Sequence, residues 1–75
     1  SPILREIFQR ALQYFAVSII CVHNHPSGEF KPSQEDKIFT QHLKEAGVVL
    51  QVNVLDHIII GDAQYYSFKD KGAMG

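Results

Sequence analysis

An apolar run at residues 16–22, AVSIICV, constrains the fold of this chain more than any other feature. Its content of Val and Ile and its lack of charge are typical of a strand that is buried on both faces of a sheet. The run ends in a loop stiffened by Pro26 and Pro32. Helical patterns precede and follow it, so we expect an α/β fold.

Two helices are predicted, one before and one after this strand. Pro2 is a typical first helical residue. Ser33 and the acidic residues after it open the second helix, and Gly47 is expected to terminate it. In the first helix, apolar residues recur at spacings of three and four and define one face against a core: Leu4, Ile7, Phe8, Ala11, Leu12 and Phe15.

The C-terminal half of the chain is rich in β-branched and aromatic residues. Residues 48–55 and 57–60 are predicted as β structure, and residues 64–68 as a last strand. The order α-β-α-β-β contains one strand–helix–strand unit that suits a crossover between parallel strands. A sheet of two or three strands with a helix on either side keeps an unpaired edge. We therefore expect residues 1–75 to form a single domain that lacks its N-terminal strands.

Composition excludes several classes of function. The net charge is −1, and the seven basic residues are scattered, so nucleic-acid binding by charge alone is not expected. Cys21 is the single cysteine and fits a reducing compartment. The apolar run is too short to span a membrane. Together these features predict a cytoplasmic protein without a membrane partner.

Three side chains are candidates for a metal site. His23 and His25 stand two residues apart on an extended segment, so they project to the same side. They follow the buried strand at its carboxyl end, where α/β sheets place their sites. Asp36 falls in the first turn of the second helix, where the helix dipole favours its ionised form. Two imidazoles and a carboxylate leave a fourth tetrahedral position open for water, which is typical of catalytic zinc.

Simpler interpretations remain open for several of these residues. A His-x-His pair is common on surface loops, and Ser33 with Asp36 can cap a helix without any metal. Asp56 and His57 interrupt an apolar run, either at a turn or strand edge, or to support a metal-bound histidine. Two others are expected to be packing residues: Cys21 and His42.

The pattern His23-Asn24-His25, seven residues, Ser33, two residues, Asp36 resembles the JAMM (MPN+, JAB) metalloprotease motif at every position. The surrounding sequence is similar to the bacterial RadC-like branch. This resemblance implies a cytidine-deaminase-like α/β/α fold and a zinc hydrolase acting on amide or isopeptide bonds of a peptide substrate. It also implies that His23, His25 and Asp36 bind Zn²⁺, and that Ser33 is catalytic and hydrogen-bonds the oxyanion. The literal His-Asn-His is a weaker match to nuclease motifs.

One part of the family motif is missing from these 75 residues. Members also carry a glutamate on a strand before the first helix, where it acts as the general base. Glu6 precedes His23 but lies on the polar face of its helix, and Glu29 and Glu35 are no better placed. A metallohydrolase is thus the first hypothesis. The alternative is a non-catalytic, metal-binding interaction module, for which the RadC name suggests a link to DNA repair.

Overall fold

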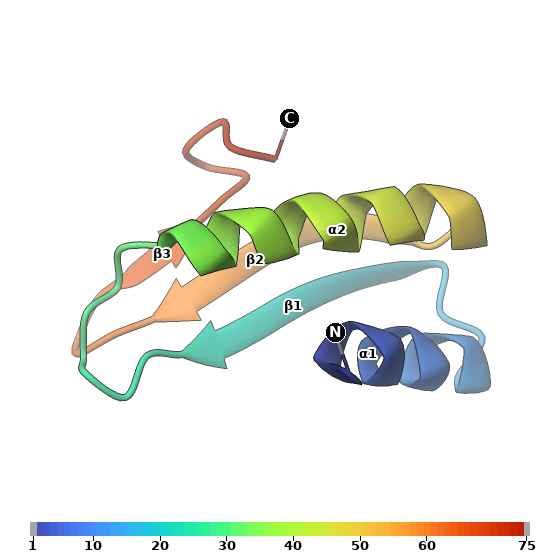
Figure 1. Ribbon diagram of the computed structural model, residues 1–75, viewed down its shortest axis with the longest axis horizontal. Helices are drawn as coiled ribbons and strands as arrows, with labels where there is room; N and C mark the ends of the chain where they lie inside the picture. Colours follow the sequence, from blue (N-terminus) through green and yellow to red (C-terminus); the bar gives the residue numbers. More distant parts are fainter. Residues whose placement is uncertain (1, 75) are drawn as a thin grey trace.

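The computed structural model describes residues 2–74, which form five elements in the predicted α-β-α-β-β order (Figure 1). Neither helix of this described part is long and apolar enough to cross a membrane. The elements are α1 (Pro2–Gln13), β1 (Ser18–Asn24), α2 (Gln34–Leu50), β2 (Asn53–Ile60) and β3 (Tyr65–Ser67).

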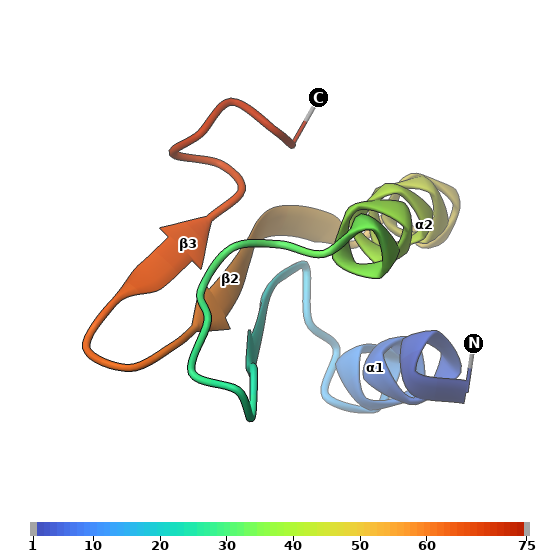
Figure 2. The ribbon, with the colours of Figure 1, turned by 60° about the vertical axis from the view of Figure 1, so that its left-hand side comes forward.

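The three strands form one mixed sheet in the order β1-β2-β3. β1 and β2 are parallel and α2 connects them, which is the predicted crossover, while β3 pairs antiparallel with β2. Parallel strands finish at the same edge, and here Asn24 pairs with Ile60. The loops that follow β1 and β2 therefore meet at one end of the molecule (Figure 2).

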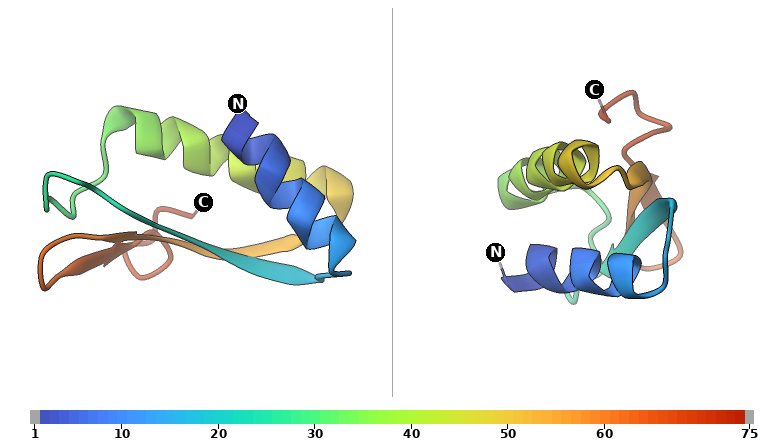
Figure 3. Two further views of the ribbon diagram at one scale, coloured as in Figure 1. Left: turned by 90° about the horizontal axis from the view of Figure 1, so that it is seen from below. Right: turned by 90° about the vertical axis from the view of Figure 1, so that its right-hand side faces the viewer.

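Both helices cover the same face of the sheet (Figure 3). The core lies between them and the sheet and includes Phe8 and Ala11 of α1 with Leu43 of α2. The expected helix on the other face is not found among residues 2–74. Ile20 and Val22 of β1 point to that uncovered face and are 54% and 53% exposed. β1 is thus covered on one face only, and two of the three expected layers are present.

The first helix is shorter than its apolar pattern predicts. α1 ends at Gln13, and Phe15 adopts a left-handed conformation with φ of 56°. Because the helix has already ended, Phe15 leaves the face that the helical period assigns to it and is 89% exposed. Leu12 is also half exposed. The prediction that these two residues face the core was therefore wrong.

The second helix is longer than predicted, because Gly47 does not terminate it. α2 continues to Leu50 and is capped by Gln51, whose φ is 59°. Gly47 lies inside the helix where the chain returns against it: a Cβ at this position would lie 2.6 Å from the Val52 carbonyl oxygen. β2 consequently begins at Asn53 and is one continuous strand, so Asp56 and His57 lie inside it and not at a turn.

Candidate metal centre

The structure brings together the three side chains that the motif singled out. Donor atoms of His23, His25 and Asp36 all lie within 4.8 Å of one another. Nε2 of His23 is 3.3 Å from Oδ1 of Asp36, and Nε2 of His25 is 2.9 Å from Oδ2. Each imidazole thus faces a different oxygen of one carboxylate, and all three side chains are partly buried.

A capping box at the start of α2 holds the carboxylate of Asp36. The backbone N–H of Asp36 donates to Ser33 Oγ over 3.1 Å, and the Ser33 backbone N–H donates to Asp36 Oδ2 over 2.7 Å. The cap and the candidate metal site therefore share residues and do not compete. Burial raises the pKa of Asp36, but hydrogen bonds from Ser33 and the electrostatic interactions with His25 and His23 outweigh it. The net result is a pKa below the usual value, which favours the ionised ligand.

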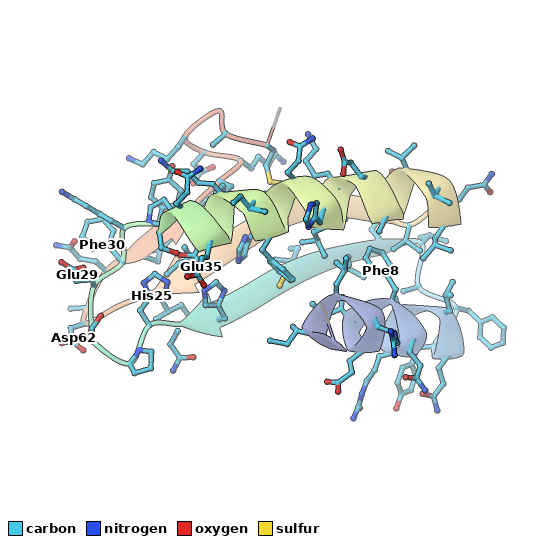
Figure 4. All side chains as sticks on the ribbon, viewed as in Figure 1. Phe8, His25, Glu29, Phe30, Glu35 and Asp62 are labelled. Carbon is cyan, nitrogen blue, oxygen red and sulfur yellow. The ribbon has the colours of Figure 1, made fainter. Side chains whose placement is uncertain are left out.

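The loop that carries His25 is fixed against the turn between β2 and β3. The His25 backbone N–H donates to the Ile60 carbonyl, and the Asp62 backbone N–H donates to the Gly28 carbonyl over 3.0 Å. Gly28 has a φ of 83°, a backbone conformation that residues with a side chain rarely adopt, so glycine is favoured at this turn. Figure 4 shows His25 and Asp62 at this end of the molecule.

The hydrogen-bond partners of His25 indicate which of its ring nitrogens is available to bind a cation. Nδ1 of His25 lies 2.8 Å from the Glu29 carbonyl oxygen, which can only accept, so Nδ1 carries the hydrogen. In a neutral ring, Nε2 then presents a lone pair to Asp36 Oδ2 at 2.9 Å. Two acceptors at this distance require a proton or a metal ion between them. The donor set therefore fits a zinc ion with one open position.

His57 lies directly behind the metal triad. It is fully buried, its Nε2 is 2.9 Å from His23 Nδ1, and its ring stacks on Phe68 with an interplanar angle of 2°. Burial and the neighbouring His23 lower the pKa of His57 to about 4, so it is neutral at physiological pH. The sequence left two interpretations of Asp56 and His57, a turn or strand edge and the support of a metal-bound histidine. The position of His57 fits the second, because its ring contacts the candidate ligand His23.

A β-bulge decides which way His57 points. The β1–β2 register shifts between Ile19 and Ile20, so Leu55 has no partner and Cys21 pairs with His57. Without this extra residue, His57 would face the uncovered side of the sheet, because side chains alternate along a strand. The sequence carries no clear signal for the bulge, and sequence reasoning likewise did not find Thr40, which contacts His57 from α2.

Asp56 points to the other face and fastens β2 to the chain beyond β3. Its Oδ1 accepts from the backbone N–H groups of His57 and Lys69, and its Oδ2 accepts from the Ser67 hydroxyl. Burial raises the pKa of this carboxyl, but the hydrogen bonds from Ser67, Lys69 and His57 together hold it below the usual value. Asp56 is therefore a structural residue that orders the backbone around His57.

We expect Asp56→Asn to reduce the free energy of unfolding by about 1–3 kcal/mol at pH 7, because its amide nitrogen cannot accept the hydrogen of the buried Ser67 hydroxyl. The folded-state pKa of Asp56 lies below the unfolded value of about 3.9. Its contribution is thus present above pH ~3.9 and is lost as the pH falls through the folded pKa. Urea unfolding between pH 7 and 3 should show a weaker acid dependence in the variant, with exposed Asp70→Asn unchanged from wild type. Equal acid dependence in wild type and Asp56→Asn would contradict this role.

Two of the remaining candidates, Cys21 and His42, line an apolar groove. The groove runs between α1 and α2 over β1 and reaches His23 and Asp36. Cys21 lines it and is half buried, and burial raises the pKa of its thiol, in keeping with a packing role. His42 also lines the groove but is exposed, so the expectation that it packs inside was wrong. Glu6 is exposed on α1.

Comparison with known proteins identifies the family. Residues 3–73 match the family model of the RadC-like JAB domain. The chain belongs to this family. A UPF0758 protein of Bacillus licheniformis is 56% identical over 68 residues, which is 91% of this chain and 30% of the relative. A UPF0758 protein of Pelobacter propionicus is 51% identical over 70 residues, or 93% of this chain and 31% of the relative. This RadC-like JAB domain thus spans about a third of the length of these relatives.

Proposed function

We propose that this RadC-like JAB domain is the zinc centre of a metallohydrolase that cleaves an amide bond in a peptide or isopeptide substrate. The observation that carries the proposal is the convergence of His23, His25 and Asp36 donor atoms within 4.8 Å. The motif that supplies these residues lies inside the matched family region. The apolar groove that reaches His23 and Asp36 offers a path for an extended peptide.

Three residues hold the metal in this proposal, and a fourth, Ser33, stabilises the oxyanion. His23, His25 and Asp36 would hold zinc, which when bound supplies a Lewis acid that lowers the pKa of a water molecule from 15.7 to about 7. Ser33 lies next to them at the start of α2, and its Oγ accepts from the Asp36 backbone N–H. The hydroxyl hydrogen of Ser33 remains available for the oxyanion that forms when a carbonyl is attacked.

Within residues 2–74, Asp36 is the carboxylate whose oxygens contact His23 and His25. Glu6 lies exposed on α1, and Glu35 lines the groove but is exposed as well. We assign the base to a glutamate outside these 75 residues, in keeping with relatives about three times as long. The lack of a positioned general base among residues 2–74 also favours the second candidate, an interaction module that binds metal without turnover.

A hydrolysis assay with peptide and isopeptide substrates separates the two candidates. Zinc-dependent cleavage by a full-length form, abolished by chelation, supports the hydrolase. Stoichiometric zinc binding without cleavage of any substrate by that form supports the interaction module. The substrate, the cytoplasmic location and any connection with DNA repair remain predictions.

Zinc is also expected to stabilise the fold, because the site ties the end of β1 to the start of α2. At a free zinc concentration 100 times the dissociation constant, the gain is about 2.7 kcal/mol. For a domain of this size each kcal/mol corresponds to a rise in melting temperature of roughly 4–8 °C. Calorimetry of chelated and zinc-loaded protein measures the shift, and Asp36→Asn, which keeps a cap acceptor, should show none. Equal melting temperatures at saturating zinc would count against the coupling.

A further inference from the structure

Thr40 is placed to set the hydrogen positions behind the candidate metal site. Its Oγ1 lies 2.8 Å from the Asp36 carbonyl oxygen, one helical turn earlier, and 2.6 Å from Nδ1 of His57. A hydroxyl has one hydrogen to donate, and a carbonyl oxygen can only accept. Thr40 therefore donates to Asp36 and accepts at its other contact, so Nδ1 of His57 carries a hydrogen.

The position of the hydrogen on His57 determines which nitrogen of His23 carries its hydrogen. In a neutral imidazole one nitrogen donates and the other accepts. Since Nδ1 of His57 donates to Thr40, its Nε2 accepts the hydrogen of His23 Nδ1 over 2.9 Å. The single hydrogen of neutral His23 is thus on Nδ1. Its Nε2 keeps a lone pair, which faces Asp36 Oδ1 at 3.3 Å.

The surroundings of His57 hold its ring in this orientation. Phe68 stacks on one face with ring centroids 4.8 Å apart, and Phe39 meets the ring edge-on at 5.7 Å. The Asp56 carboxylate accepts from the backbone N–H groups of His57 and of Lys69, which follows Phe68 in the sequence. His25 reaches the same tautomer by a different route, through the Glu29 carbonyl.

We infer that Thr40 and His57 are positioning residues that fix the Nδ1–H tautomer of His23 and thereby aim its Nε2 lone pair at the metal. The relay runs from the Asp36 carbonyl through Thr40 and His57 to His23. The role toward zinc rests on the proposed function, whereas the hydrogen positions are a property of the chain itself. Partners of this kind usually contribute 10- to 100-fold to metal affinity.

The test pairs Thr40→Val with Thr40→Ser. Valine removes the oxygen that accepts from His57 Nδ1, so His57 is free to place its hydrogen on Nε2, which forces His23 to place its own there too. Serine keeps the oxygen. We expect zinc affinity, measured by competition with a chelator, to fall roughly 10- to 100-fold in Thr40→Val and less than about 3-fold in Thr40→Ser. His57→Phe, which preserves a ring stacked on Phe68 but has no acceptor, should resemble Thr40→Val.

Imidazole ¹⁵N spectra of the metal-free protein provide a readout that does not depend on zinc. At about pH 8, above the ordinary histidine pKa of about 6.5, wild type and Thr40→Ser should show an Nδ1–H tautomer for His57 and a hydrogen on Nδ1 of His23. Thr40→Val should show Nε2–H tautomers. An Nε2–H tautomer at His57 in the wild type overturns the relay, as does equal zinc affinity in Thr40→Val and Thr40→Ser. Absence of zinc binding in a wild type with the expected tautomers would instead overturn the proposed function and leave the relay established.

Discussion

We expect this RadC-like JAB domain to bind one zinc ion per chain, and we expect replacement of His23 or Asp36 to abolish that binding. The reason is that each variant removes one of three donors that converge within 4.8 Å. With two protein ligands left, the affinity for zinc should fall by more than the roughly 10- to 100-fold that residues hydrogen-bonded to the metal ligands contribute. The measurement is metal analysis of purified protein after chelation and reloading with zinc, using His23→Ala and Asp36→Asn.

The choice of variants keeps folding separate from metal binding. Asp36→Asn retains an acceptor for the Ser33 backbone N–H and so preserves the capping box, whereas Asp36→Ala would remove it. His42→Ala is the matched control, since His42 is an exposed histidine on the same helix. Circular dichroism checks that each variant is folded. Undiminished zinc in both His23→Ala and Asp36→Asn would show that the metal assignment is wrong.

The 75-residue chain should hydrolyse peptide or isopeptide substrates slowly, even when loaded with zinc. Cleavage needs a group that carries a proton from water to the leaving nitrogen, and such general acid–base catalysis contributes roughly 10²–10⁴ in rate. Glu6 is exposed on α1, and the carboxylate that contacts the histidines, Asp36, is itself a proposed ligand. A longer form of the protein that includes an upstream glutamate should be faster by about this factor.

One assay on two lengths of chain makes this comparison, with Glu6→Gln added to the shorter one. Glu6→Gln should leave the residual rate unchanged. If the short chain is as fast as the long one and Glu6→Gln abolishes its activity, then Glu6 is the general base and our placement of the base is wrong. If neither length cleaves any substrate while both bind zinc, the interaction module is the better description.

The sequence alone determined the order of elements and the meeting of the candidate ligands. The order of elements is encoded locally: helical periodicity marks α1 and α2, and the apolar run marks β1. The His-x-His pair at the end of a strand and an aspartate in a first helical turn are brought together by the crossover itself. For this reason, and because their spacing resembles the JAMM motif, His23, His25 and Asp36 were identified before the structure placed them within 4.8 Å of one another.

Only the tertiary structure decided where α2 ends, which face of the sheet the helices cover, and what stands behind His23. Gly47 lies inside the helix because the backbone at Val52 packs so closely against it that a Cβ would not fit. Local sequence patterns do not predict such a contact between two segments. His57 meets Thr40 and His23 across sequence separations of 17 and 34 residues. That meeting depends on one bulge in the β1–β2 register, and a shift of one residue would turn His57 to the opposite face.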